Sequence, residues 1–269
     1  MTKRVISAIV LVLLIVPLLY IGGLPFNILL SALSVCALYE MFHMKETKDK
    51  LPLIIKIIAY ILVVFFTYNA SNIVDFQYHL DYKIMAFLIF VFLCPIVFIN
   101  DFKKYNISDA LYVIGSVLFI GLSFSLLVAL RNYGWKDIIY LALITVCTDT
   151  FALFTGKLVG KHKLTSLSPK KTVEGLVGGS LMGTFVPTAF FHTVINPSYP
   201  LLALIFITLG LSLITQIGDL VFSSIKRYYG MKDFSDLIPG HGGILDRFDS
   251  LIFVVLAFTM IIDYLGGVV

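Results

Sequence analysis

Long apolar runs separated by short polar loops constrain the fold of this chain more than any other feature of its sequence. About nine of these runs are long enough to form transmembrane helices, and 59% of all residues are hydrophobic. A soluble core could not bury so much apolar surface. The sequence therefore predicts an all-α polytopic membrane protein, with spans near residues 5–22, 24–43, 52–70, 84–100, 108–130, 137–159, 173–194, 200–222 and 250–268.

Lysine and arginine are distributed unevenly among the loops, and this sets the expected orientation. If the N-terminus is cytoplasmic, the cytoplasmic segments hold sixteen of the 20 lysines and arginines, and the outer segments hold three. Short cytoplasmic loops of membrane proteins carry such an excess. We therefore expect nine spans in the cytoplasmic membrane of the cell, with the N-terminus in the cytoplasm and the C-terminus outside.

Polar residues are concentrated in the later part of the chain. Residues 1–140 contain about five spans joined by short, chemically plain loops, whereas residues 141–269 contain two long loops at 160–172 and 223–249. Both long loops are expected on the cytoplasmic side. The sequence shows no internal repeat of the kind found in many transporters. Its three cysteines have no metal-binding spacing, and its net charge of +4 gives no reason to expect a nucleic-acid partner.

Four carboxylates lie inside or close to the expected spans, where an ionisable residue is a candidate for function. Glu40 and Asp263 are close to span ends, and a position at the membrane interface explains them. Asp149 and Asp219 lie within the expected spans. Small residues at helical spacing follow Asp149, which predicts close packing against another helix. They are Ala152, Gly156 and Gly160, and the next span repeats the pattern at Gly175, Gly179 and Gly183.

Asp219 belongs to a polar row on an otherwise apolar helix. The row repeats at spacings of four, three, four and three residues, so its members share one face. An interhelical hydrogen-bond seam would explain the uncharged members, but an aspartate with a lysine two turns away favours a functional site. The row consists of Ser212, Gln216, Asp219, Ser223 and Lys226.

The first long loop carries lysines and hydroxyl residues in a tight group. Ser168, Lys170, Lys171 and Thr172 offer ammonium and hydroxyl donors to a phosphate. They do not fit the G-x-x-x-x-G-K-[ST] order of a P-loop. A basic segment beside a membrane can also contact anionic head groups without specificity. The residues alone leave both interpretations open.

The second long loop places carboxylates next to a glycine-rich turn. Asp246 and Asp249 are three residues apart and share a helical face. Together with Asp219 they offer oxygen ligands of the kind that Mg²⁺ prefers, and the glycines allow backbone N–H groups to face an anion. The alternatives are a solvated helix start for the two aspartates and a simple turn residue for His241.

The two loops together resemble the signature of a known family. The second loop reads Ser223-x-Ile225-Lys226-Arg227, Lys232-Asp233 and Pro239-x-His241-Gly242-Gly243-x-x-Asp246-Arg247-x-Asp249, and the first reads Ser168-Pro169-Lys170-Lys171-Thr172-x-Glu174-Gly175. This pattern is similar to that of the phosphatidate cytidylyltransferases, the CDP-diacylglycerol synthases. The resemblance covers residues 149–249, and the first 140 residues agree only in hydropathy and number of spans.

The resemblance implies a membrane enzyme that condenses CTP with phosphatidic acid to give CDP-diacylglycerol and pyrophosphate. It also implies a homodimer, and Mg²⁺ around the residues matching Asp219 and Asp246, with K⁺ allowed as a second cation. A phosphate monoester is mostly dianionic at neutral pH, because its second pKa is about 6. The attacking phosphate therefore needs no general base, and catalysis depends on positioning and charge neutralisation.

The expected site residues follow from the loops and from this chemistry. Lys226 and Arg247 are expected as catalytic cations, and His241 as a donor to a phosphate oxygen rather than as a proton acceptor. The expected metal ligands are Asp149, Asp219, Asp246 and Asp249, of which Asp219 and Asp246 are also counted as catalytic. The expected substrate-binding residues are Ser168, Lys170, Lys171, Thr172, Ser223, Arg227, Lys232, Gly242 and Gly243.

Three other functions are compatible with parts of the sequence. A CDP-alcohol phosphotransferase would also use Mg²⁺ and aspartates, but its D-G-x-x-A-R…G-x-x-x-D-x-x-x-D pattern is absent from the sequence. A cation-coupled transporter could use Asp149 and Asp219 on an ion pathway, but this leaves the His-Gly-Gly loop unexplained. A non-catalytic scaffold would carry its intramembrane acids at a needless energetic cost.

Overall fold

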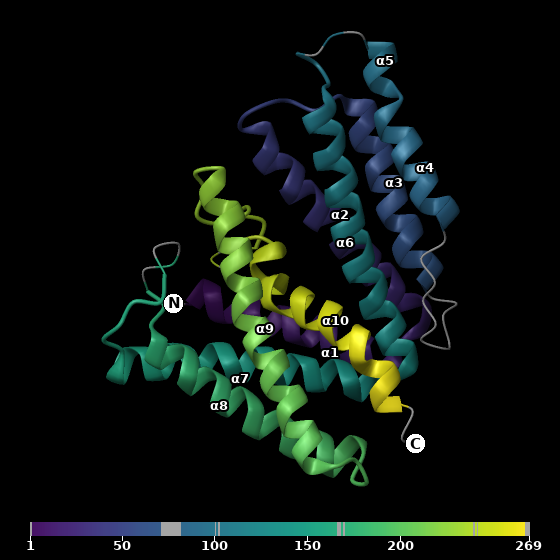
Figure 1. The fold of residues 1–269 in the computed structure, drawn as a ribbon. Coiled ribbons are helices and arrows are strands. Elements are labelled where there is room, and N and C mark those ends of the chain that lie inside the picture. The colour runs from purple at the N-terminus through teal and green to yellow at the C-terminus, as the bar shows by residue number, and fades with distance from the viewer. Residues whose placement is uncertain are drawn as a thin grey trace. The chain divides into compact units, whose positions relative to one another are not determined.

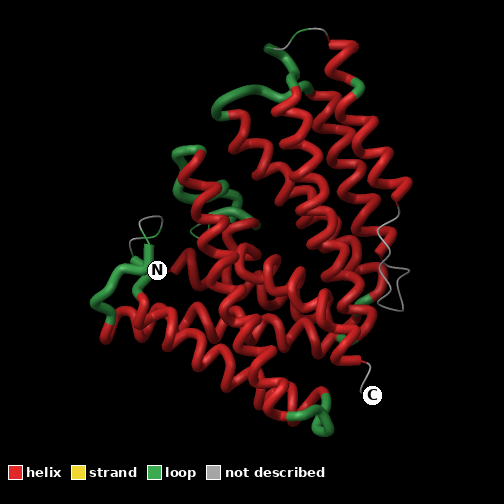
Figure 2. The backbone as a smooth tube through the Cα atoms, in the orientation of Figure 1, coloured by secondary structure: helices red, strands yellow, loops and turns green. Residues whose placement is uncertain are grey.

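The computed structural model describes residues 2–70, 82–99, 101, 103–165, 168, 170–238, 240 and 242–266. Helices dominate these residues, and Figure 2 shows no strand among them. Contacts between residues divide the chain into two compact units. The first unit comprises Met1–Tyr133 and Asp233–Leu245, and the second comprises Gly134–Lys232 and Asp246–Val269.

The first unit is a bundle of apolar helices. It contains α1 (Thr2–Ile21), α2 (Gly23–Glu46), α3 (Leu53–Asn69), α4 (Tyr82–Leu93), α5 (Pro95–Ile99) and α6 (Ile107–Tyr133). Helix α6 packs against α2, α3 and α4, and Figure 1 shows α3, α4 and α6 side by side. Apolar side chains fill the core of this bundle, and Leu38, Val63 and Phe124 are fully buried there.

Two polar pairs link neighbouring helices of the first unit. Lys45 Nζ, near the end of α2, lies 2.5 Å from the Asp109 carboxylate at the start of α6. The hydroxyl oxygens of Ser31 and Thr67 lie 2.8 Å apart and link α2 to α3. An unpaired polar group is costly in an apolar interior, so these pairs also fix how the helices pack.

The second unit contains the remaining helices. They are α7 (Trp135–Val159), α8 (Val173–Phe190) with a π-helical turn at Phe191–Ile195, α9 (Leu201–Tyr228) and α10 (Leu245–Gly266), of which only the first residue, Leu245, belongs to the first unit. Helices α7 and α8 lie side by side (Figure 1). A Cβ atom on Gly179 would lie only 2.7 Å from the Thr148 carbonyl oxygen and 2.7 Å from the Cβ of Ala152. The small residues therefore allow the two backbones to approach closely, which confirms the predicted packing role of the glycine row.

The polar row of α9 faces other helices of its unit, as its spacing predicts. Ser212 Oγ lies 2.7 Å from Thr148 Oγ1 on α7. Gln216 Nε2 donates hydrogen bonds to the Leu176 carbonyl at 3.2 Å and to Ser180 Oγ at 2.9 Å, both on α8. Ser212 and Gln216 are buried. For these uncharged members of the row, the interpretation as an interhelical seam is confirmed.

Each expected span contains helix among the described residues. Within that part of the chain, four helices (α2, α6, α7 and α9) are long and apolar enough to cross a membrane. Helices α4 and α5 share one expected span, and Pro95 separates them because proline interrupts the hydrogen-bond pattern of a helix. The count of nine crossings, their orientation and a functional division near residue 140 stay predictions.

Candidate functional site

Two segments of the loop between α7 and α8 pair with each other. Lys163 and Thr172 form an isolated antiparallel bridge, and the Leu164 N–H donates to the Lys171 carbonyl at 2.9 Å. Thr172 Oγ1 accepts a 3.1 Å hydrogen bond from the Gly175 N–H, so Thr172 is the N-cap of α8. The backbone on both sides of Lys171 is thereby fixed.

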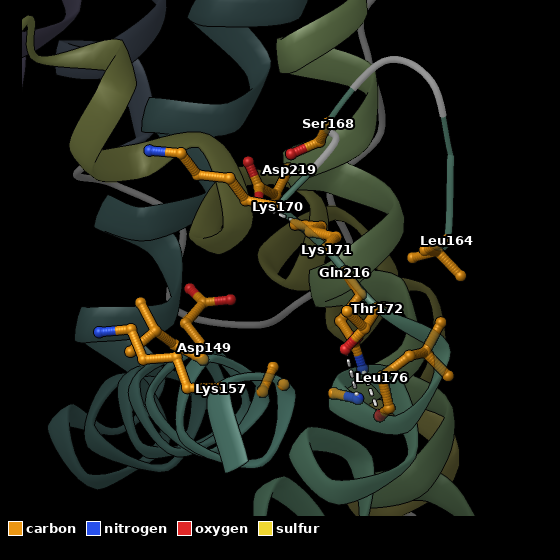
Figure 3. Close-up of a pocket in the computed structure, with 14 residues that line it drawn as sticks. Asp149, Lys157, Leu164, Ser168, Lys170, Lys171, Thr172, Leu176, Gln216 and Asp219 are labelled. Atoms are coloured by element: carbon orange, nitrogen blue, oxygen red, sulfur yellow. Dashed lines mark hydrogen bonds and ion pairs between the residues drawn. The ribbon is translucent and has the colours of Figure 1, made fainter. Parts of the chain in front are cut away.

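A cavity of about 640 Å³ lies beside this loop, entirely within the second unit. Its volume is in the range of small-molecule sites. Leu153, Leu164 and Leu176 supply apolar walls. The loop residues predicted to bind phosphate and two of the predicted metal ligands share this cavity. The polar residues that line it are Asp149, Lys157, Ser168, Lys170, Lys171, Thr172, Gln216 and Asp219 (Figure 3).

Lys171 and Asp219 form an ion pair at the wall of the cavity. The two side chains are 24% and 26% exposed, so a ligand in the cavity can reach both. Asp149 lines the same cavity from α7 and lies within electrostatic range of Lys171 and Asp219. An anionic ligand therefore has to compete with Asp219 for the Lys171 ammonium.

A second ion pair joins the last turn of α9 to the first turn of α10. Lys226 Nζ lies 2.6 Å from Asp246 Oδ1, and the two side chains are only 11% and 5% exposed. Two charges taken out of water are stable only when they are paired and hydrogen-bonded. The structure thus brings together two predicted catalytic residues that are 20 residues apart in sequence.

The predicted metal ligands are only partly brought together. The Asp249 carboxylate is close enough to those of Asp219 and Asp149 for their charges to interact, and Ser250 Oγ donates to Asp149 Oδ2 at 3.3 Å. Among the described residues, no three His, Cys, Asp or Glu side chains converge in a metal-binding group. Mg²⁺ commonly uses one or two carboxylates and completes its shell with water and substrate phosphate. The donor chemistry fits Mg²⁺, and the ligand set stays a prediction.

The other predicted cations of the second unit lie at its surface. Arg227, Lys232 and Arg247 are exposed, and Ser223 is partly buried. Arg227 Nη1 donates to the Met231 carbonyl at 3.1 Å, so its guanidinium is directed by the turn after α9. Their exposure leaves these three cations accessible to a ligand.

The glycine turn before α10 belongs to the first unit. Gly242 has a φ of 80°, in the left-handed region that favours glycine, and the Ile238 N–H donates to its carbonyl at 2.8 Å. Gly243 is buried. His241 and the side chain of Asp263 lie outside the described residues.

The structure draws attention to two residues, Lys157 and Glu40, that were not among the predicted site residues. Lys157 lines the cavity. It lies eight residues after Asp149, a spacing that keeps both on one broad side of a helix, so the sequence contained a signal for it. The Glu40 side chain is fully buried and accepts hydrogen bonds from the segment 235–245, so it is held by the protein, and its depth in a membrane stays a prediction. No local pattern indicates this contact, since its partners are about 200 residues away in sequence.

Known proteins resemble the chain over almost its whole length. Residues 2–265 match the model of the Cytidylyltransferase family. A phosphatidate cytidylyltransferase of Staphylococcus haemolyticus is 34% identical over 257 residues, which are 95% of this chain and 96% of that protein. The protein of the same name from Bacillus subtilis is 34% identical over 260 residues, 95% of each chain. One from Staphylococcus aureus is 35% identical over 257 residues, 95% of this chain and 96% of that protein. The chain therefore belongs to the cytidylyltransferase family.

Proposed function

We propose that this chain is a phosphatidate cytidylyltransferase, which condenses CTP with phosphatidate to give CDP-diacylglycerol and pyrophosphate. Relatives that bear this name cover 95% of the chain. The observation that carries the proposal is the cavity of the second unit, where lysines and hydroxyl groups of one loop face the same space as two aspartates. The apolar helices around it suit an enzyme whose substrate is a lipid.

The proposed reaction joins two anions. An oxygen of the phosphatidate phosphate attacks the α-phosphorus of CTP, a new P–O bond forms, and the bond to the β-phosphate breaks to release pyrophosphate. The attacking phosphate is mostly dianionic at neutral pH, so no proton has to be removed from it. The residues of the site have to hold the phosphates in line and offset their charge.

The lysines of the cavity serve this purpose. Lys170 and Lys171 lie on the loop, and Lys157 reaches the cavity from α7 (Figure 3). When a phosphate enters, Lys171 exchanges the Asp219 carboxylate for phosphate oxygens, which carry more negative charge. Ammonium–phosphate hydrogen bonds are among the stronger polar contacts in proteins. The exchange also leaves Asp219 available to a cation.

The carboxylates would hold Mg²⁺. Asp219, with Asp149 and Asp249 in electrostatic range, offers the oxygen donors that this ion prefers. Asp246 is a further candidate, and K⁺ is proposed as a second cation. When bound, Mg²⁺ supplies positive charge to the triphosphate and to the departing pyrophosphate.

Three exposed cations and His241 complete the proposed site. Arg227, Lys232 and Arg247 bind phosphate oxygens from the aqueous side, and His241 donates to a phosphate oxygen. We further propose that both long loops face the cytoplasm, where CTP is available, and that the enzyme acts as a homodimer. The lipid phosphate then enters sideways at the depth of the membrane head groups.

An assay with purified protein in detergent tests the proposal. Phosphatidate is offered with each of the four ribonucleoside triphosphates, with and without Mg²⁺, and lipid-linked nucleotide is measured. We expect lipid-linked CMP from CTP in the presence of Mg²⁺. Absence of this product with CTP under every metal condition would refute the proposal. Turnover of CDP-diacylglycerol with an alcohol, or substrate flux into sealed vesicles without nucleotide, would favour a phosphotransferase or a transporter instead.

A further inference from the structure

Glu40 of α2 is a buried acid of the first unit. The three residues that donate hydrogen bonds to it belong to the same unit. Its side chain is fully buried, with 0% exposure. Oε1 accepts hydrogen bonds from Ser235 Oγ at 2.6 Å and from the Ile244 N–H at 2.8 Å. Oε2 accepts one from the Leu245 N–H at 2.8 Å. The carboxylate is therefore built into the end of the second long loop.

The two backbone N–H groups that Glu40 binds lie at the start of α10. This helix begins at Leu245, and the first N–H groups of a helix have no partner within the helix. A carboxylate at that position accepts their hydrogen bonds and lies at the positive end of the helix dipole. Glu40 therefore caps the start of α10, at two residues that belong to the first unit like Glu40 itself, although 204 residues separate it from Ile244.

Gly243 is required for the same contact. A Cβ atom at this position would lie 2.6 Å from Cδ and 2.7 Å from Oε2 of Glu40. The φ of Gly243 is outside the left-handed region, so its backbone conformation would tolerate another residue. Glu40 is thus the obstacle to a side chain here, and this explains the glycine without any ligand.

We infer that Glu40 is a positioning residue for the transfer reaction. It fixes the backbone of Leu245, and Asp246 is the next residue in the chain, in the first turn of α10. Lys226 then binds the Asp246 carboxylate. The backbone before Asp246 and its side chain are held by two different residues. The catalytic part of this inference rests on the proposed function, whereas the capping contact does not.

The test compares variants of the full-length protein purified in detergent. Glu40→Gln removes the charge and places an amide NH₂ where one oxygen accepts a hydrogen bond, and Ser235→Ala is a milder change that removes a single donor. Glu46→Gln is the matched control, since Glu46 lies on the same helix and pairs with Lys56 at 2.7 Å. Amide hydrogen exchange, followed on peptides, and the kcat and KM for CTP are measured for each variant.

We expect Glu40→Gln to accelerate exchange in peptides that contain residues 244–247 by about tenfold or more, the size of one lost hydrogen bond to a charged group. Peptides from α3 and α7 should keep their protection. The kcat should fall while the KM for CTP stays near the wild-type value, and Glu46→Gln should behave as wild type. Unchanged exchange at 244–247 would overturn the inference, and so would loss of protection spread evenly over all helices.

A double-mutant cycle tests the link to Gly243. Gly243→Ala places a methyl group against the carboxylate, and Glu40→Asp withdraws that carboxylate by one methylene. The double variant should lose less kcat than the product of the two single effects, because the shorter acid makes room for the methyl group. Independent, multiplicative effects would overturn the coupling. If wild-type protein makes no CDP-diacylglycerol, the proposed function fails, and the exchange data still decide whether Glu40 caps α10.

Discussion

The buried pair of Lys226 and Asp246 allows a prediction that separates stability from catalysis. Its charged atoms lie 2.6 Å apart, and neither side chain is more than 11% exposed. At an effective dielectric constant of 20, their Coulomb attraction is roughly 6 kcal/mol, most of which offsets the desolvation of the two groups. Lys226→Met removes the attraction and leaves the desolvated aspartate behind. We expect this change to cost about 3–5 kcal/mol of the free energy of unfolding.

The second part of the prediction uses the double variant. Lys226→Met combined with Asp246→Asn removes both charges, so most of the lost stability should return. Activity should not return, because the proposed chemistry uses both residues. Asp246→Asn alone should also lower the stability, because the buried Lys226 ammonium loses its carboxylate. The protein should nevertheless remain folded and membrane-inserted, and turnover should be abolished.

Unfolding in mixed micelles of detergent and SDS measures the stability, and formation of lipid-linked CMP from CTP and phosphatidate measures the activity. Lys226→Met with wild-type stability would show that the pair does not contribute as the structure indicates. Near-normal activity in Asp246→Asn would remove Asp246 from the catalytic residues.

Three further predictions concern the helix packing, the cavity and the metal. Gly179→Ala should destabilise the protein by about 1–3 kcal/mol, because its methyl group would meet the backbone of α7. Gly210→Ala is the matched control, since nothing lies within 4 Å of a Cβ at that position. Thermal unfolding in detergent compares the two variants. Lys171→Met should lower kcat/KM for CTP by about tenfold to a hundredfold, the size of a lost charged hydrogen bond. Lys161→Met, at an exposed position, should leave kcat/KM unchanged. Steady-state kinetics measure both variants, and equal losses of kcat/KM would argue against a specific site. EDTA should abolish turnover and added Mg²⁺ should restore it, with helix content by circular dichroism unchanged; full activity in EDTA would exclude the proposed metal.

The positions of the helices could be predicted because a membrane span is encoded by one local quantity, the hydropathy of about 20 consecutive residues. The faces of those helices followed from spacing alone. Ser212 and Gln216 are buried on the side that the polar row predicts, and Gly179 packs where its row predicts. The end of a helix is harder to predict, and α9 continues to Tyr228, beyond the apolar run near 200–222.

The partners of the charged residues could not be predicted in the same way. Spacing placed Asp219 and Lys226 on one face of α9. In the structure, Asp219 binds Lys171 of the loop between α7 and α8, and Lys226 binds Asp246 of α10. Such pairs depend on which helices become neighbours, which hydropathy does not encode. Glu40 is the extreme case, because its place near a span end suggested only an interfacial position, whereas its partners lie 204 and 205 residues later in the sequence.

The capping of α10 by Glu40 also has a consequence for biosynthesis. Ribosomes make the chain from its N-terminus, so Glu40 leaves the ribosome 204 residues before Ile244. The acceptor for the start of the last helix is therefore already in the membrane when that helix emerges. The start of α10 then depends on a group synthesised 204 residues earlier, and α10 expressed apart from α2 would lack its N-terminal cap. Removal of α2 should for this reason affect α10 as well as the neighbours of α2 in the first unit.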